Sequence, residues 1–268
     1  MTFLLSRWRS GFLAVLAVAA LAAAPAQAEP RFAWRAGLAT ADGQTLEQRF
    51  APPVGFAREP AAPGSFVEWL RELPMKSEGA PVLLHTGALK LRQDVHAGVI
   101  DIDVGKRDLQ QCADAIMRLR AEWLFSQGRK SEIAFNDTKG KRLRFSARPK
   151  QDYAGFRKYM DYVFAYAGTY SLERELVAAS ADDIRAGDVF IKGGFPGHAV
   201  FVTDVVVNPA TGEKRFLLTQ SYMPAQEIHV LKNPAARDGS VWYGTDFGET
   251  LVTPEWRFSR QQLKRWKS

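Results

Sequence analysis

The feature that most constrains the fold is a β-hairpin pattern in the second half of the chain. Residues 199–207 are mostly β-branched or aromatic and are apolar on both faces, which predicts a strand in the centre of a sheet. Turn-forming residues follow at 208–213, and residues 215–222 return antiparallel. The hairpin therefore places His198 at the start of its first strand and Gln220 near the end of its second.

The first 28 residues predict a cleaved signal peptide. Arg7 and Arg9 precede an apolar run at 11–23, and residues 26–28 form a small-x-small cleavage site. The apolar run is too short to span a bilayer, and no later stretch is long and apolar enough to do so. We therefore expect an exported, soluble protein of the periplasm or the extracellular space, without an integral membrane segment after cleavage.

The charge pattern bears on the partners of the chain. The formal net charge is +7, but basic and acidic residues alternate, and no Arg/Lys stripe with interleaved aromatics appears. Nucleic acid is therefore not an expected partner, whereas a cell-wall peptide or another component of the anionic envelope is. The four histidines are scattered without zinc-ligand spacing, so neither a metal site nor a cofactor is expected.

Composition also suggests how the chain is divided. Residues 29–64 are rich in Pro and Ala and lack a periodic pattern, which predicts an irregular N-terminal arm. Residues 65–268 are long enough to bury one core and are expected to form a single domain. Within it, residues 129–184 are heterogeneous and include a predicted aromatic-rich helix at 152–167. At the end of the chain, residues 256–266 predict a basic helical turn.

Cys112 is the only cysteine in the chain. A helix predicted from Asp108 to about Gln127 carries it on the apolar stripe, near the positive end of the helix dipole. Two interpretations stay open: a small buried hydrophobe of the core, or a reactive thiol whose pKa is lowered by the helix N-terminus and a neighbouring base.

His198 is the candidate base for this thiol. Glycines on either side of Phe195-Pro196, Gly197 among them, let the backbone turn tightly and leave the imidazole approachable. A third group must hold the ring through its other nitrogen, and the side-chain oxygen of Gln220 is suited to this. A simple hairpin register places residues 221–223 opposite His198, so that Gln220 needs a bulge to reach it. Tyr222 is the alternative orienting residue.

Further residues are candidates for oxyanion or substrate contacts. The Cys112 backbone N–H, with the side chain of Gln110 or Gln111, would stabilise an oxyanion. Gly197 and Tyr222 flank the candidate base. Asp103 shares a strand face with Asp101, and the strand leads into the cysteine helix. The two carboxylates are interpreted either as part of a solvated strand face or as an acid–base pair or cation site.

Two groups of motifs resemble known families. Residues 186–191 and 197–202 resemble the second half of the NlpC-type cell-wall amidases and peptidases, which cleave amide bonds of peptidoglycan stem peptides with Cys, His and a third polar residue. This resemblance implies a papain-like α+β domain with a cysteine-bearing helix packed on an antiparallel sheet. The spacing from Cys112 to His198 is longer than is usual there, so residues 129–184 would be an insertion.

More closely, residues 101–105, 110–114 and 220–226 resemble a family of exported bacterial proteins of unknown function, over most of residues 65–260. The function expected from the chain is a cysteine hydrolase that cleaves amide bonds in peptidoglycan stem peptides. Cys112 would be the nucleophile, His198 the base and then the acid, and Gln220 the orienting residue. The alternative is a non-catalytic envelope-binding module on the same fold, in which Cys112 and His198 are structural.

Overall fold

The computed structural model describes residues 29–36 and 43–267 of the chain. The signal peptide predicted for residues 1–28 lies outside the described residues. The helices in this part of the chain are α1 (Leu46–Arg49), α2 (Phe66–Arg71), α3 (Cys112–Ser126), α4 (Tyr153–Tyr166) and α5 (Thr169–Glu175). Single 3-10 turns are η1 (Ala33–Arg35), η2 (Lys130–Glu132), η3 (Phe145–Ala147), η4 (Ala181–Asp183) and η5 (Arg260–Gln262).

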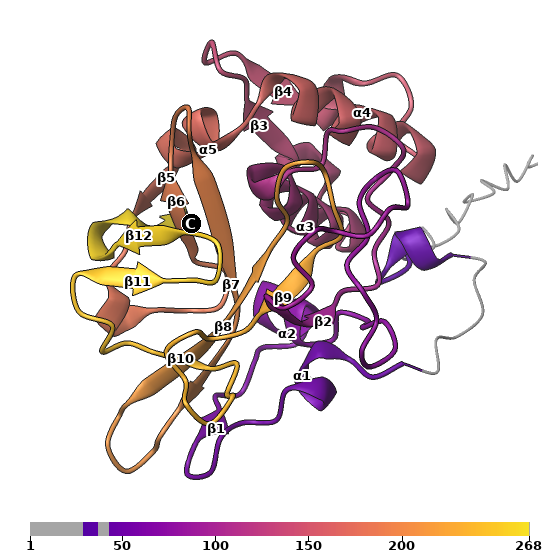
Figure 1. Ribbon diagram of the computed structural model, residues 1–268. Helices are drawn as coiled ribbons and strands as arrows, with labels where there is room; N and C mark the ends of the chain where they lie inside the picture. Colours follow the sequence, from indigo (N-terminus) through magenta and orange to yellow (C-terminus); the bar gives the residue numbers. More distant parts are fainter. Residues whose placement is uncertain (1–28, 37–42, 268) are drawn as a thin grey trace, which may run out of the picture.

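Strands make up the centre of the molecule. They are β1 (Ala57–Arg58), β2 (His96–Val99), β3 (Ala134–Asn136), β4 (Arg142–Arg144), β5 (Leu176–Ala178), β6 (Val189–Lys192), β7 (His198–Val207), β8 (Lys214–Gln220), β9 (His229–Leu231), β10 (Tyr243–Gly244), β11 (Thr250–Val252), β12 (Arg257–Ser259) and β13 (Leu263–Trp266). Nine of them form one antiparallel sheet in the order β2-β9-β8-β7-β6-β13-β5, with β1 paired to β7 and β10 to β8 (Figure 1). β3–β4 and β11–β12 are separate two-stranded hairpins.

The predicted hairpin is confirmed as β7–β8, the longest strand pair of the sheet. Its turn forms because the Asn208 side-chain oxygen accepts hydrogen bonds from the backbone N–H groups of Ala210 and Thr211. Both faces of β7 are covered, as its apolar composition predicts: nine of its ten residues are buried, and only Val207 is half-buried.

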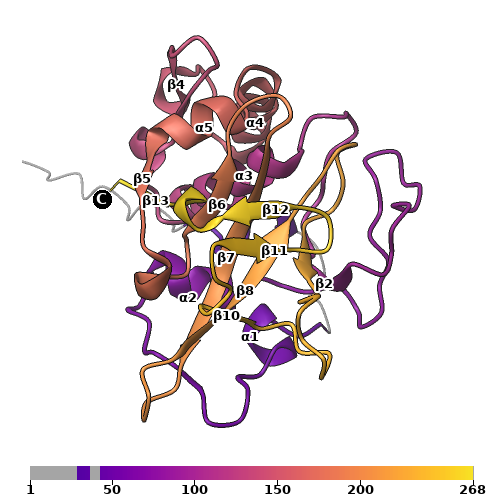
Figure 2. The same cartoon turned by 60° about the vertical axis from the view of Figure 1, so that its left-hand side comes forward.

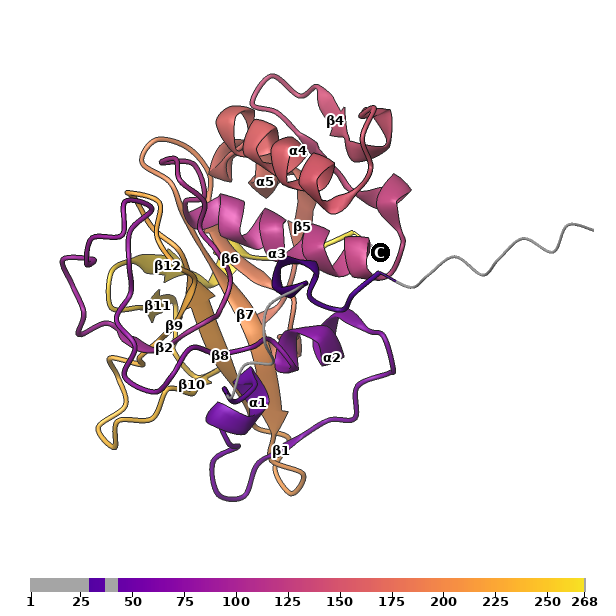
Figure 3. The same ribbon diagram turned by 90° about the vertical axis from the view of Figure 1, so that its right-hand side faces the viewer.

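The two faces of the sheet carry different layers. Successive β7 side chains point to opposite faces, so Ala199 and Phe201 join the core beneath α2 and α3, whereas Val200 and Val202 join a second core beneath β12. Figure 2 shows the β11–β12 hairpin in front of β7 and β8, with α3 behind them. Figure 3 shows the helical face, on which α2 and α3 cross the sheet and α4 and α5 lie beyond α3.

The expected fold class is wrong. A papain-like α+β arrangement would have a cysteine-bearing helix packed on a modest antiparallel sheet, whereas the described chain is mostly one large sheet of nine antiparallel strands with five short to medium helices. The physical reason is that short strands from distant segments pair with the β7–β8 hairpin or with the strands beside it and so enlarge the sheet. β1, β5, β10 and β13 each have two to four residues, too few to show a periodic pattern.

The C-terminal prediction fails for the same reason. Residues 256–266 were expected to form a helical turn, but they form β12, η5 and β13. Leu263 and Lys264 pair with β6, and the Arg265 guanidinium donates to the buried carboxylate of Asp188 over 2.6 and 2.8 Å. These partners lie about 75 residues away in sequence, so local composition cannot predict them.

The proposed division of the chain stays a prediction. Residues 29–64 contain η1, α1 and the short strand β1, which is tied to the end of β7. Residues 129–184 contain the β3–β4 hairpin, α4, α5 and β5. The last of these strands enters the main sheet through β13, so this segment is joined to the rest of the described chain by backbone pairing.

Candidate functional site

Cys112 is the first residue of α3, three residues nearer the helix N-terminus than the predicted start implied. The helix begins here because the Asp114 carboxylate accepts from the Gln111 backbone N–H over 3.1 Å. Asp108, the expected N-cap, instead accepts from the Gln111 side chain and from the backbone N–H of Ala225. The contact with Ala225 ties the start of α3 to the loop that follows β8. At this position Cys112 is 9% exposed.

His198 starts β7 and is almost fully buried. Aromatic rings enclose the imidazole: the centroids of Tyr222, Trp256 and Phe258 lie 4.6, 5.2 and 5.9 Å from its own. Burial lowers the pKa of His198 to about 4, an effect that the hydrogen bond to Gln220 opposes and the Lys90 charge assists. The imidazole is therefore neutral at physiological pH.

A bulge in the hairpin brings Gln220 to the face of His198. Pairing runs from Val207 opposite Lys214 to Asp204 opposite Leu217, and then shifts by one residue so that Val202 is opposite Leu218. Without this shift Gln220 would lie on the other face of the sheet, because the side-chain period of a strand is two. With it, His198 and Gln220 are diagonal neighbours on one face, and His198 Nε2 lies 3.0 Å from Gln220 Oε1.

The Gln220 amide is held in one orientation by its other contacts. Its Nε2 group donates to the Glu255 carboxylate over 2.6 Å and lies 3.3 Å from His229 Nε2. His229 uses its Nδ1–H for the Glu227 carbonyl oxygen at 2.9 Å, so its Nε2 is the acceptor. A carboxylate can only accept, so the amide nitrogen must face Glu255 and the amide oxygen must face His198.

This orientation fixes the tautomer of His198. Because Gln220 Oε1 is an acceptor, His198 Nε2 carries the proton and donates it, which leaves Nδ1 with a free lone pair. Nδ1 is then the atom that can accept a proton. The contacts therefore set which nitrogen of the ring is the base.

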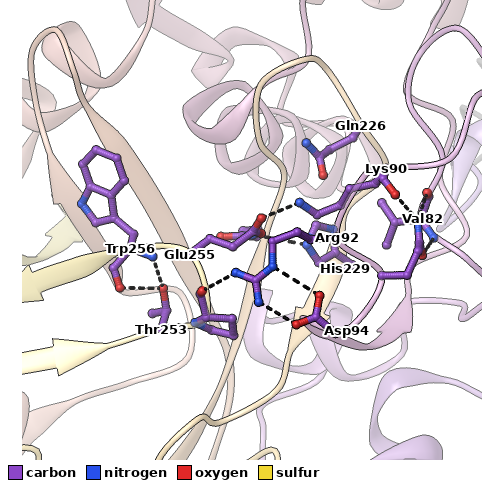
Figure 4. A network of polar contacts seen from close by, with 12 residues as sticks. Val82, Lys90, Arg92, Asp94, Gln226, His229, Thr253, Glu255 and Trp256 are labelled. Carbon is purple, nitrogen blue, oxygen red and sulfur yellow. Dashed lines mark hydrogen bonds and ion pairs between the residues drawn. The ribbon is translucent and has the colours of Figure 1, made fainter.

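Glu255 is itself held by a buried ion pair with Lys90 at 2.6 Å; the two side chains are 10% and 7% exposed (Figure 4). Lys90 Nζ also lies 5.6 Å from the Tyr222 ring centroid. Sequence reasoning missed Lys90, His229 and Glu255. Both members of the ion pair come from segments outside the hairpin, and no local pattern in either segment marks them.

The thiol and the imidazole are not hydrogen-bonded to each other among the residues that the structure describes. Cys112 lies beside β7, where the backbone N–H of Ala199 is directed to its sulfur. Burial raises the pKa of the Cys112 thiol to about 11, with a contribution from Asp114, although backbone N–H groups of Ala113, Ala199 and Cys112 oppose the rise. The reactive-thiol interpretation required a lowered pKa, whereas the pKa is raised here because the helix N-terminus acts on a desolvated sulfur, as the buried-core interpretation implies.

Gln110 carries a feature expected of an oxyanion donor. It is fully buried, its Oε1 accepts from Arg118 Nη1 at 2.8 Å, and its Nε2 is a buried donor without a partner in the described structure. A buried amide N–H without an acceptor costs free energy, so its presence two residues before Cys112 calls for an explanation. The Ser221 hydroxyl donates to the Gln110 carbonyl over 3.1 Å and ties this residue to the end of β8.

Arg118 holds Gln110 in place. Its guanidinium is fully buried and donates to Glu122, to Gln110 and to both the carbonyl and the carboxylate of Asp103, over 2.8 to 2.9 Å. Burial would lower the pKa of Arg118, but Glu122 and Asp103 outweigh it and raise that pKa. Asp103 therefore supports the site through Arg118, two hydrogen bonds away from Gln110.

The other sequence-predicted residues have different surroundings. The Gln111 side chain donates its Nε2–H to Asp108 Oδ1 at 3.0 Å, so this N–H is already engaged by a carboxylate. Tyr222 packs its ring on His198, and the pKa of its hydroxyl is raised by burial, then by Glu255 and Cys112. Gly197 is enclosed: a Cβ there would lie 2.5 Å from the Gly194 carbonyl oxygen and 2.8 Å from that of Lys192.

Asp101 and Asp103 do not form a carboxylate pair. Asp101 pairs with Arg35, whereas Asp103 pairs with Arg118 and, at 3.6 Å, with Arg157. Burial tends to raise the pKa of Asp103, but Arg118 and Arg157 hold it below its usual value. Each carboxylate is thus neutralised by its own arginine, and their positions past the end of β2 separate them from the strand on which the prediction placed them.

An open cleft of about 1080 Å³ adjoins the enclosed histidine. Tyr222, Glu255 and Trp256, all neighbours of His198 or Gln220, form part of its wall, whereas Cys112 and His198 themselves do not line it. Cationic side chains surround the mouth. Arg92 pairs with Asp94, and Lys192, Lys232 and Arg257 are exposed and have no carboxylate partner among the described residues.

Comparison with known proteins identifies a family for nearly the whole described chain. Two matches, over residues 46–150 and 145–265, are to a family described as a domain of unknown function (4846). The chain belongs to this family. The first match contains Cys112 and the second contains His198 and Gln220. No curated protein and no solved structure matches the chain.

Membership of this family confirms the closer of the two resemblances, the one to proteins of unknown function. No match links the chain to the NlpC-type enzymes. Each helix within the described residues is too short or too polar to cross a membrane.

Proposed function

We propose that this protein is an exported cysteine hydrolase that cleaves amide bonds, with Cys112 as nucleophile, His198 as base and then acid, and Gln220 as the orienting residue. The observation that carries the proposal is the chain of contacts from Glu255 through Gln220 to His198. It leaves Nδ1 of a neutral imidazole as the free base at the strand position directly before Ala199, whose N–H is directed to the thiol.

The reaction begins from the neutral pair. A thiol with a pKa of about 11 and an imidazole with a pKa of about 4 do not exchange a proton at rest, so His198 acts as a general base during attack. The thiol proton passes to Nδ1 as the sulfur–carbon bond forms. The side chains must approach each other for this step, as catalytic hydrogen bonds commonly tighten only in the substrate complex.

The tetrahedral intermediate carries a negative oxygen. The unpaired Nε2–H of Gln110 and the backbone N–H of Cys112 are the donors proposed for it. The proton on Nδ1 then moves to the nitrogen of the leaving amine as the carbon–nitrogen bond breaks. Water, deprotonated by the same imidazole, attacks the resulting thioester and releases the acid and the free thiol.

The cleft supports a substrate class. Lys192, Lys232 and Arg257 place unpaired positive charge at the mouth, and Trp256 and Tyr222 supply flat apolar surface in the wall. A peptide with free carboxylates fits this combination, and peptidoglycan stem peptides are of this kind. The apolar side chains of Phe195 and Met223, 92% and 58% exposed, lie two residues before Gly197 and directly after Tyr222 in sequence and offer further contact area.

The test is cleavage of soluble peptidoglycan fragments, followed by mass spectrometry of the products. Cys112→Ala and His198→Ala should abolish cleavage, and His85→Gln, a half-buried histidine outside the network, should leave it unchanged. Cleavage that persists in Cys112→Ala would overturn the proposal.

One observation favours the second candidate, a non-catalytic envelope-binding module. Both Cys112 and His198 are buried, and no hydrogen bond joins them in the described structure. In that case the cleft binds the peptide without cleaving it. The same fragments would then bind with equal affinity to the wild type and to Cys112→Ala, and neither protein would release products.

A further inference from the structure

A second cavity lies at the other end of α3, apart from the thiol. It has a volume of about 600 Å³ and is formed by the second half of α3, the β3–β4 hairpin, the end of α5 and the end of β13. Figure 3 shows α5 and the C-terminal end of the described chain close to α3. Much of its wall comes from residues 129–184, the segment for which the candidate active site provides no role.

Arg120 is the central group of this cavity. It is half-buried, and no carboxylate or other hydrogen-bond acceptor contacts its guanidinium in the described part of the chain. Instead, aromatic rings surround the charge: its central carbon lies 4.5 Å from the centroid of Trp123, 5.1 Å from Phe66 and 5.7 Å from Trp266. Cation–π contacts offset part of the lost hydration but satisfy none of the five N–H donors.

The surroundings add charge and a second unsatisfied donor. Five cationic side chains line the cavity, against two carboxylates, Glu132 and Glu175. Those two are already paired with Arg129 and Arg142, so Arg120, Arg174 and Lys267 retain unneutralised charge. The Nε1–H of Trp266, which lines the same cavity, is buried without an acceptor.

The surroundings of Arg120 disfavour the charged form of its guanidinium. Burial, together with the nearby Arg129, lowers the pKa of its guanidinium to about 10, against the attraction of Glu132. A partly desolvated charge without a hydrogen-bonded partner costs stability, and an anionic ligand that supplied the missing acceptors would remove this cost. The missing partner must be an acceptor that reaches several donors at once.

We propose that this cavity is a binding site for a phosphate-bearing ligand, with Arg120 and Arg174 as its principal contacts. A phosphate group carries acceptor oxygens in the geometry that guanidinium forks match bidentately. Three cationic side chains of the cavity, Arg120, Arg174 and Lys267, have no carboxylate partner among the residues that the structure describes. One singly charged carboxylate would not neutralise them, which favours an anion with two or more negative charges.

This site is independent of the proposed hydrolase. Arg120 lies eight residues after Cys112, about 12 Å along the same helix, and none of the residues that line its cavity lines the cleft beside His198. Ligand binding in the cavity around Arg120 therefore does not depend on whether Cys112 is a nucleophile.

The test is calorimetric titration of the protein with inorganic pyrophosphate, accompanied by thermal melting curves of the same protein with and without pyrophosphate. Wild type should bind, with an affinity that falls as salt is added. Arg120→Met, which keeps an apolar stem of similar length, should weaken binding at least tenfold, and Arg174→Gln should weaken it by a smaller factor. Arg237→Gln, an exposed arginine that lines neither cavity, is the matched control and should bind as wild type does.

Melting curves separate a binding role from a structural one. Without ligand, Arg120→Met should melt at a higher temperature than wild type, because an uncompensated charge has been removed, and pyrophosphate should no longer raise its melting temperature. A lower melting temperature for Arg120→Met, with unchanged pyrophosphate affinity, would overturn the proposal. So would an absence of binding to the wild type.

A second experiment distinguishes two sources of the phosphate, a lipid headgroup and a soluble compound. Vesicles of phosphatidylglycerol in phosphatidylcholine are sedimented with wild type and with Arg120→Met. Co-sedimentation of the wild type that is lost in the variant identifies a lipid headgroup as the ligand. Pyrophosphate binding with no co-sedimentation identifies a soluble phosphate compound. Vesicle binding that is equal in both proteins counts against the site.

Discussion

The rate at which Cys112 reacts with iodoacetamide should rise with pH through the neutral range, without a plateau. The structure raises the pKa of the thiol from its usual 9.0 to about 11 through burial and the nearby Asp114. The reactive species is the thiolate, so this rise lowers its fraction at pH 7.5 from about 3% to about 0.03%, or roughly 100-fold. The alkylation rate should increase tenfold for each pH unit between pH 6 and pH 9.

The assay is simple because Cys112 is the only cysteine. Intact-mass spectrometry of the native protein gives the rate for this thiol alone, and the same protein in denaturant supplies the reference. Native alkylation at pH 7.5 should be at least roughly 100-fold slower than the reference. His198→Ala should follow the same profile above pH 5, because an imidazole with a pKa of about 4 carries no charge there.

Two results would refute this reasoning. A rate that is fast and constant between about pH 5 and pH 8, and that becomes slow in His198→Ala, would show a thiolate–imidazolium pair at rest. A native thiol that stays unreactive even at pH 9, while the denatured protein reacts, would show that Cys112 is a closed core residue. The first result changes the resting state of the proposed site, and the second removes the site.

Three further predictions concern the network and its surroundings. Glu255→Gln leaves Lys90 buried without its charge partner, and should lower the free energy of unfolding in urea by about 3 kcal/mol. Lys90→Met in the same chain should restore most of this loss, and a loss that the double variant keeps would contradict the ion-pair account. His198 and His229 have pKa values lowered by burial to about 4 and about 3. The unfolded chain therefore binds more protons than the folded chain below pH 6.5. The free energy of unfolding should fall by about 1.4 kcal/mol per pH unit for each histidine as the pH falls from 6.5 towards 4. His198→Asn should make this pH dependence shallower, and an unchanged pH dependence would count against a neutral His198. Gly197→Ala should destabilise by about 1–3 kcal/mol because its Cβ meets backbone oxygens, whereas Gly168→Ala, where nothing lies within 4 Å, should stay within about 0.5 kcal/mol.

The sequence was most informative where local pattern and tertiary role agree. The β7–β8 hairpin follows from an apolar run, a turn and a return strand, and it positions both His198 and Gln220. The bulge after Val202 followed only from the requirement that Gln220 reach His198. The position of this bulge could be found only from the structure, because Thr203 has no local feature that marks it as an extra residue.

Sequence reasoning was less informative where partners come from afar. The fold class was wrong because short strands such as β5 and β13 form by pairing with the hairpin's neighbours and carry no pattern of their own. Glu255 and Lys90 lie 165 residues apart and meet only in the folded chain. The two interpretations of Cys112 could not be separated from the sequence, because the position at a helix N-terminus is visible there and the burial of the sulfur, which raises its pKa, is not.

The central claim is that Cys112 forms a covalent acyl intermediate. The most direct measurement is an acid quench of the protein at short times after mixing with peptidoglycan peptides, followed by intact-mass and peptide mapping. The account predicts a thioester adduct on Cys112 whose mass equals the acyl half of the cleaved peptide. The adduct should accumulate in wild type and be absent in Cys112→Ala and His198→Ala. Product formation without any adduct on Cys112, at a rate that Cys112→Ala retains, would contradict it.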